Sequence, residues 1–169
     1  MKPPLLPSET FRRVIRVARF DGLSVLGVAG TFALISALWR DVPGAIVGLL
    51  VAAAGAFELH GVTLLRAGRT RGMSWLISSQ LYLMLILVIY ATVGYVRHDI
   101  TLWRQAVTPE SADAIRQMGK TVDEVLLLMV RFTYAGVAAA TVLYQGGMAV
   151  YYLRRRQAVE AAVLEDLPE

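Results

Sequence analysis

The sequence predicts an all-α, polytopic membrane protein with four transmembrane helices. First, 56% of the 169 residues are apolar and the mean hydropathy is +0.54, whereas soluble domains are roughly 45–50% apolar. Second, the apolar residues concentrate in four blocks, each of a length that crosses a hydrocarbon core about 30 Å thick. Third, basic residues alternate between the segments that join the blocks. We therefore expect residues 1–169 to form a single four-helix transmembrane domain.

The predicted spans cover residues 22–39, 44–65, 74–96 and 125–153. A leader at residues 1–20 precedes them, and Ser8 resembles a helix cap. Apolar residues on one face of the leader (Phe11, Val14, Ile15, Ala18) and arginines on the other predict an N-terminal amphipathic helix in the interfacial headgroup region.

The outer segment, residues 97–124, precedes the fourth helix. Thr108 followed by Pro109 predicts a helix start, and apolar residues continue from there at helical spacing. We expect the fourth helix to begin outside the membrane, extending beyond it, and to run through it without a break. The run Val125–Val130 then lies at or above the interface, covered by helix tilt, by the outer segment or by another subunit. The tail at residues 154–169 is expected to extend the helix and fray.

Basic residues predict that both termini are cytoplasmic. Eleven of the seventeen lie in three alternating regions: Lys2, Arg12, Arg13, Arg16, Arg19; Arg66, Arg69, Arg71; and Arg154, Arg155, Arg156. The net charge of +4 is thereby explained by orientation in a cell membrane, which we expect to be a bacterial inner membrane, and not by binding of nucleic acid. Aromatic residues mark the predicted boundaries: Trp39 and Tyr95 outside, and Phe20, Trp75, Tyr151 and Tyr152 inside.

A layer of polar residues is predicted in the cytoplasmic half of the bundle. Ionisable groups inside a membrane are costly, which makes Glu58 and His60 site candidates. Depth counted from the inner boundaries places them level with polar groups on the other helices: Ser78, Ser79, Gln80, Tyr144 and Gln145, with Ser24 slightly shallower. Two interpretations remain open, a structural hydrogen-bond network and a proton or cation site in a cavity open to the cytoplasm.

The second predicted helix carries small residues at four-residue steps, Gly44, Gly48, Ala52 and Ala56, followed by His60. Such a stripe permits close helix crossing. Glu58 points about 200° away from His60, so both faces of this helix need partners. Unless one face borders water, self-association is the simpler arrangement, and the lipid bilayer is the other expected partner.

The sequence gives little support for a metal site, a haem site or an enzyme active site. The chain has no cysteine and two histidines, His60 and His98, at different predicted depths. We therefore expect no metal, haem or other cofactor, and no enzyme activity. Arg131 is predicted at the outer interface, where it can snorkel, with a gating or anion-binding role as the alternative.

These observations lead to a functional hypothesis. The chain is a small homo-oligomeric channel or transporter for a proton, ion or small solute. The alternative is a non-transporting accessory or assembly subunit that joins other membrane subunits in a larger complex.

Overall fold

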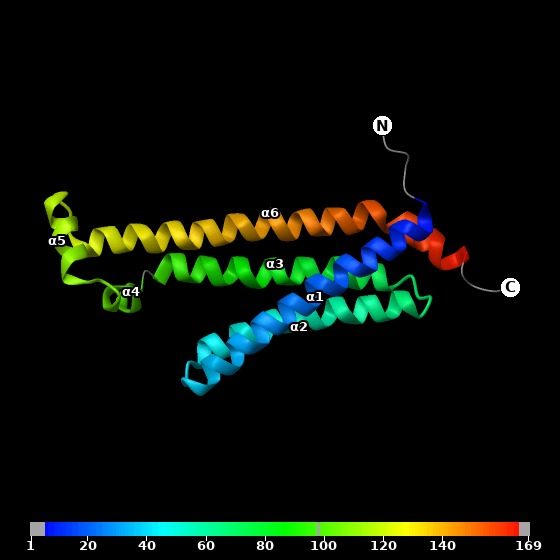
Figure 1. Cartoon of the computed structure of the whole chain (residues 1–169), viewed down its shortest axis with the longest axis horizontal. Helices are drawn as coiled ribbons and strands as arrows, with labels where there is room; N and C mark the ends of the chain where they lie inside the picture. Colours follow the sequence, from blue (N-terminus) through cyan, green and yellow to red (C-terminus); the bar gives the residue numbers. More distant parts are fainter. Residues whose placement is uncertain (1–5, 98, 166–169) are drawn as a thin grey trace. The chain divides into compact units, whose positions relative to one another are not determined.

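The computed structural model describes residues 6–97 and 99–165, and the regular structure in this part of the chain is helical (Figure 1). The elements are α1 (Pro7–Leu38), α2 (Val42–Arg66), α3 (Gly72–Arg97), α4 (Thr101–Gln105), α5 (Pro109–Gln117) and α6 (Val122–Glu165). Four of them, α1, α2, α3 and α6, are long and apolar enough to cross a membrane. The prediction of an all-helical chain with four helices of spanning length and apolarity is thereby confirmed, while membrane insertion and the orientation of the termini stay predictions.

Helix α1 joins the predicted leader and the first span in one element of 32 residues. Pro7 occupies the first turn, where its missing N–H and fixed φ cost nothing. Ser8 is therefore inside the helix and is not its cap, and the N-cap Leu6 makes no side-chain capping bond.

The fourth span differs from its prediction at the outer end. Thr108 caps α5 through a bond from the Ser111 backbone N–H, as the sequence indicates. However, α5 ends at Gln117, and α6 begins only at Val122. Gly119 lies between them with φ of +71°, a left-handed conformation that ends helices and that glycine adopts without penalty. The single continuous helix predicted from Pro109 onward is thus wrong.

Helix α6 is long for a spanning helix. Its 44 residues correspond to about 66 Å at 1.5 Å per residue, roughly twice the hydrocarbon thickness of a bilayer. The predicted helical extension after Arg156 is present through Glu165, and residues 166–169 lie outside the described residues. Helix α6 is therefore longer than is needed to cross a bilayer of ordinary thickness.

The chain divides into two compact units. The first contains residues up to Ile86 together with those from Leu143 onward, and the second contains Leu87–Val142. Helices α3 and α6 contribute residues to both. The polar side chains considered below as a site belong to the first unit.

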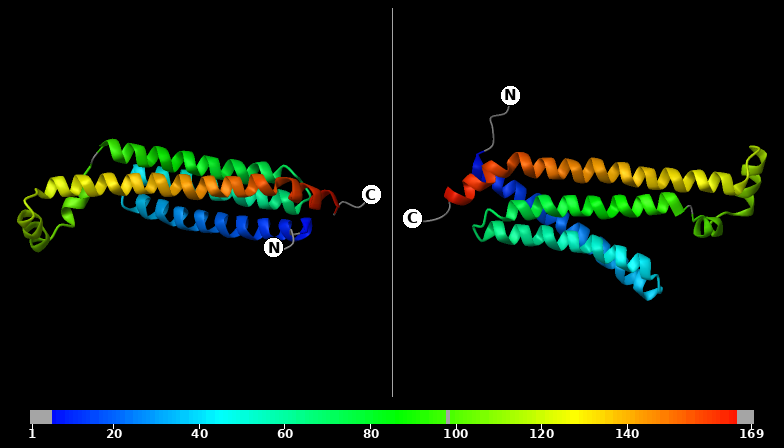
Figure 2. Two further views of the ribbon diagram at one scale, coloured as in Figure 1. Left: turned by 90° about the horizontal axis from the view of Figure 1, so that it is seen from above. Right: turned by 180° about the vertical axis from the view of Figure 1, so that it is seen from behind.

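In the first unit, α1 and α2 form a hairpin of adjacent helices (Figures 1 and 2). Asp41 in the connecting turn caps α2, accepting a bond of 3.1 Å from the Gly44 N–H. Farther along, Gly22 and Gly55 meet at close range. A methyl group on Gly55 would lie only 2.7 Å from the Gly22 carbonyl oxygen, so the two backbones approach closely because neither position has a side chain.

The first unit also contains the hydrophobic core, to which all four long helices contribute. Its buried members are Val14, Ile15, Ala18, Val62, Leu65, Met73, Leu76, Tyr152 and Val159. The apolar face predicted for the leader is therefore buried against other helices of this chain. Contact of the leader with a membrane surface stays a prediction. The basic face of the leader is the face that remains exposed.

In the second unit, short helices lie beside the start of α6. Val125, Leu126 and Met129 line an apolar hollow together with residues of α4, α5 and the turns that follow them. Leu126 and Val130 are buried. The outer segment thus accounts for part of the cover that the run Val125–Val130 needs.

Candidate functional site

Asp21 of α1 is a buried acid that connects three helices. Its side chain is 7% exposed. One carboxylate oxygen accepts a hydrogen bond of 3.0 Å from the Gln80 amide of α3, and the other accepts one of 3.0 Å from the Tyr144 hydroxyl of α6. Both partners are donors, and their hydrogen bonds offset part of the cost of removing the carboxyl group from water.

Glu58 of α2 is the second buried acid, 2% exposed. Its Oε1 accepts a bond of 2.6 Å from the hydroxyl of Tyr152, a residue of α6 with no exposed surface. This distance is at the short end of those found for O–H···O⁻ hydrogen bonds. Two acids on two helices are thus each held by a tyrosine of α6, eight residues apart along that helix.

The two carboxyl groups belong to one cluster. Asp21 and Gln80 both lie within interaction range of the Glu58 side chain. Since each of α1, α2, α3 and α6 contributes at least one group, the four helices with spanning length and apolarity meet at this cluster. We call Asp21, Glu58, Gln80, Tyr144 and Tyr152 the polar cluster.

The polar cluster has unused hydrogen-bonding capacity. Gln80 is 1% exposed, and while its amide nitrogen donates to Asp21, its Oε1 has no hydrogen-bond partner among the described residues. The same is true of Oε1 of the buried Gln145. Buried acceptors are nearly always satisfied in proteins, so the Oε1 of Gln80 can accept a hydrogen bond from a further donor such as a carboxyl proton.

Several residues predicted for the polar layer are buried in the first unit. Glu58 and Gln80 are members of the polar cluster, and Tyr144 reaches Asp21 although its own side chain is 56% exposed. Ser79 is buried, but its hydroxyl donates to the Leu76 carbonyl of its own helix at 2.8 Å. Because this bond stays within α3, Ser79 does not connect α3 to the polar cluster.

Other predicted members point elsewhere. His60, Ser78 and Ser24 are exposed. The His60 ring packs edge-on against Trp75, with 4.9 Å between centroids. Arg131 is an exposed residue of the second unit. Equal depth along a helix did not place these side chains together, because each helix is rotated so that a different face is buried.

The packing face of α2 also differs from the prediction. Gly48 and Ala52 are buried and Gly44 is partly buried, but Ala56 is exposed, and the contact continues through Gly55 instead. An α-helix advances 3.6 residues per turn, so a straight contact line moves from four-residue to three-residue steps. Glu58 lies on this inner side and finds its partner in α6 of the same chain. The argument for self-association from two opposite faces of α2 therefore loses its premise.

Sequence reasoning missed two members of the polar cluster. Asp21 lies between the predicted leader and the predicted first span and was assigned to neither, and Tyr152 was predicted to be an interfacial anchor but is fully buried. Periodicity could have found both. Asp21 continues the buried stripe of Val14 and Ala18, and Tyr152 lies seven residues after Gln145 and seven before Val159, all of which are buried.

The fold and the polar cluster together define a class, the multi-pass helical membrane proteins with buried acids. In the described part of the chain no group of three or more His, Cys, Asp or Glu side chains is arranged to hold a metal ion. No protein-family model, curated protein or solved structure matches this chain.

Proposed function

We propose that the protein is a small channel or transporter and that the polar cluster binds the proton or monovalent cation that it moves. The observation that carries this proposal is the pair of buried carboxyl groups, Asp21 and Glu58, on helices long and apolar enough to span a membrane. Ionisable groups inside membrane proteins are rare and commonly mark ion or proton pathways.

The chemistry follows from the partners. Two neighbouring carboxylates repel each other, so a proton or cation stabilises the pair. The unpartnered Oε1 of Gln80 can accept a hydrogen bond from a proton bound at Glu58. The hydroxyls of Tyr144 and Tyr152 then donate to whichever carboxyl oxygen carries negative charge.

The test is proton or cation flux into proteoliposomes that contain the purified protein and a pH-sensitive dye. Glu58→Gln and Asp21→Asn each keep the side-chain shape and remove the titrating group, and we expect either to reduce flux at least about tenfold, within the range that loss of a proton-transfer group costs. His60→Gln and Ser78→Ala change exposed polar residues on the same two helices that carry Glu58 and Gln80, and we expect them to retain wild-type flux.

Retention of wild-type flux by Glu58→Gln would reject the assignment of the polar cluster. Flux that is absent from the wild type itself would reject transport. We also propose that the working unit is a homo-oligomer in the cell membrane, supported no longer by α2 but by the exposed small residues Gly136 and Ala140 of α6, which leave room for a second helix to approach closely. Native mass spectrometry tests this part separately, since a bare monomer in gentle detergent would overturn it.

The second candidate is a non-transporting accessory subunit of a larger membrane complex. It is favoured by the apolar hollow of about 460 Å³ in the second unit, whose lining includes Trp103, Ile115 and Met118. A stable hetero-complex in the native mass spectrum, together with no flux by the purified chain, would support this candidate over transport.

A further inference from the structure

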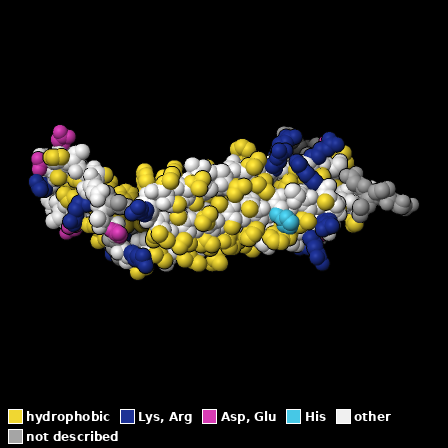
Figure 3. Space-filling model, turned by 90° about the horizontal axis from the view of Figure 1, so that it is seen from below, with side chains coloured by type: hydrophobic (Ala, Val, Ile, Leu, Met, Phe, Trp, Pro, Cys, Tyr) yellow, Lys and Arg dark blue, Asp and Glu magenta, His cyan; other side chains and the backbone are white. Residues whose placement is uncertain are grey.

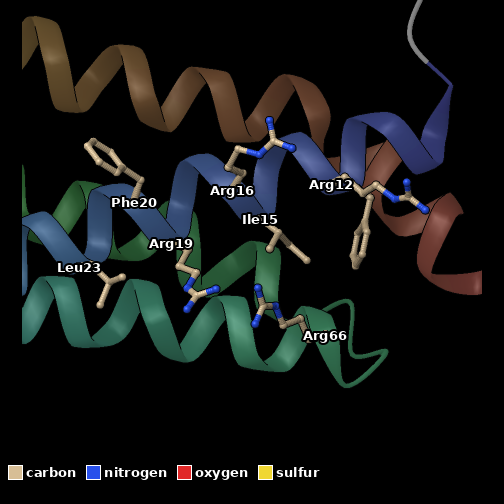
Figure 4. Close-up of a pocket in the computed structure, with 8 residues that line it drawn as sticks. Arg12, Ile15, Arg16, Arg19, Phe20, Leu23 and Arg66 are labelled. Atoms are coloured by element: carbon tan, nitrogen blue, oxygen red, sulfur yellow. The ribbon is translucent and has the colours of Figure 1, made fainter.

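A hollow of about 530 Å³ lies along α1 and the end of α2 in the first unit (Figure 4). Its lining is divided between arginines and apolar side chains: Arg12, Arg16, Arg19, Arg66, Phe11, Ile15, Phe20 and Leu23. The hollow has no residue in common with the polar cluster.

The arginines of this hollow have no acidic partner. Among residues 6–97 and 99–165, none of the four forms an ion pair. Arg19 of α1 and Arg66 of α2 point toward one another (Figure 4), so their like charges repel and an anion between them would be attracted by both. Glu9 lines a neighbouring hollow with Arg12, Arg13 and Arg16, whereas no acidic residue is among the described residues that line the hollow of Arg19 and Arg66.

Two apolar residues of the lining are exposed beside these charges. Phe20 is 75% exposed and Leu23 is 50% exposed, and Ile15 and Leu23 lie on the same side of α1 as Arg19 in the close-up (Figure 4). A free phosphate would pair with the arginines and leave these side chains uncovered. An amphiphile covers both, with its phosphate at the arginines and its acyl chains against Phe20 and Leu23.

The position along the helices agrees with such a ligand. Basic side chains gather around this end of the first unit, and hydrophobic side chains cover the adjoining surface (Figure 3). The hollow thus lies where a spanning helix passes from apolar to charged residues, at the level of lipid headgroups.

We propose that this hollow is a binding site for an anionic phospholipid, held through its phosphate by Arg19 and Arg66. The assignment is independent of transport, since it rests on residues outside the polar cluster and is measured as binding.

The test uses the full chain in a mild detergent, titrated with phosphatidylglycerol, and counts bound lipid by native mass spectrometry. The variant R19Q/R66Q is expected to bind phosphatidylglycerol about thirtyfold more weakly, since each basic residue near anionic lipid contributes about 1 kcal/mol. Phosphatidylcholine is expected to bind wild type and variant equally weakly. The variant R19K/R66K retains the charge and is expected to keep most of the affinity.

The matched control is R13Q/R69Q, which removes the same charge from α1 and from the turn after α2 without touching the lining of the hollow. It is expected to change affinity by less than about threefold, the effect of long-range charge alone. An equal loss of affinity for phosphatidylglycerol in both double variants would contradict a specific site and would indicate long-range attraction between the lipid and the basic surface. If soluble glycerol 3-phosphate displaced the lipid at an equal concentration, the ligand would be a small anion and the proposal of a phospholipid would be wrong.

Discussion

The two units of this chain use polar residues in opposite ways. In the first, Asp21 and Glu58 are buried, and their hydrogen-bond partners are 59 to 123 residues away in sequence. In the second, the ion pair of Arg104 with Asp123 has side chains that are each 59% exposed, and Arg116 pairs with Asp113 only three residues away.

The buried polar groups help to determine how the helices pack, whereas the exposed ion pairs contribute little to the choice of fold. A buried acid left without its partner keeps its desolvation cost, whereas an exposed ion exchanges its partner for water. We therefore expect single substitutions in the first unit to have large effects and those in the second to have small ones. The four predictions below test that contrast in detergent micelles, from the largest effect to the smallest.

The largest effect is expected at the crossing of α1 and α2. Gly55→Ala would place a methyl group 2.7 Å from the Gly22 carbonyl oxygen and from the Leu26 amide nitrogen. Backbone atoms cannot move aside cheaply, so we expect a loss of about 2–3 kcal/mol in the free energy of unfolding, measured by titration with sodium dodecyl sulphate.

Gly136 in the second unit is the matched control, since a methyl group there would meet nothing within 4 Å. Gly136→Ala is expected to stabilise α6 by up to about 1 kcal/mol through helix propensity. Destabilisation by Gly136→Ala would instead place this face of α6 in a contact between subunits and so sharpen the proposal of self-association.

The next effect is expected at Tyr152. Tyr152→Phe removes the hydroxyl that donates to Glu58 at 2.6 Å and leaves the acid without that donor. We expect a loss of about 1–2 kcal/mol, measured in the same titration. The loss should disappear in the background of Glu58→Leu, which removes the acceptor, if it arises from this bond.

The adjacent Tyr151 provides the control, because its buried hydroxyl has no hydrogen-bond partner among the described residues. Tyr151→Phe is expected to be neutral or slightly stabilising. A similar loss for both tyrosines would mean that packing, and not the bond to Glu58, accounts for the effect.

A smaller effect is expected for the ion pair of Arg104 and Asp123. A double-mutant cycle with Arg104→Ala and Asp123→Ala should give a coupling of about 0.2–1 kcal/mol, typical of exposed pairs. The coupling should fall as salt is raised from low concentration to 1 M, because exposed charges are screened. A coupling above about 2 kcal/mol would mean that an exposed ion pair of the second unit contributes as much stability as a buried hydrogen bond of the first, contrary to the contrast drawn above.

The smallest effect is expected at Asp99, after α3. The Thr101 backbone N–H donates to its carboxylate at 2.9 Å, and this bond holds the pKa of Asp99 below its usual value. A lowered pKa in the folded state contributes stability above the unfolded-state pKa of about 3.9. That contribution is lost as the pH falls through the folded-state value.

Titration of the Asp99 carboxyl group by NMR measures this directly. Asp99→Asn removes this contribution, so stability should fall slightly at pH 7, stay unchanged well below the folded-state pKa, and depend less on pH below about pH 4. A carboxyl pKa at or above the ordinary value would contradict the hydrogen bond to Thr101.

The outline of this protein was accessible from its sequence because hydropathy and helix signals are local. The spans predicted at residues 44–65 and 74–96 agree with α2 and α3 to within two residues. Pro109 correctly marked the start of α5. Glu58 was identified as a candidate because an acid within an apolar segment can be recognised without knowing how the helix is rotated.

The candidate site was predictable only in part. Counting residues from a boundary gives depth but not rotation, so His60 and Ser78 were grouped with Glu58 although they are exposed. Asp21 and Tyr152 were missed for the converse reason, since both lie near predicted boundaries. The break between α5 and α6 depended on one glycine, Gly119, in a left-handed conformation.

The sequence by itself determined that the chain is helical, with four segments of spanning length, because these properties are sums over neighbouring residues. Only the tertiary structure decided which acid meets which tyrosine. That choice depends on how each helix is rotated about its axis, and the rotation is set by contacts distant in sequence, such as the approach of Gly22 to Gly55 and the bond from Tyr152 to Glu58.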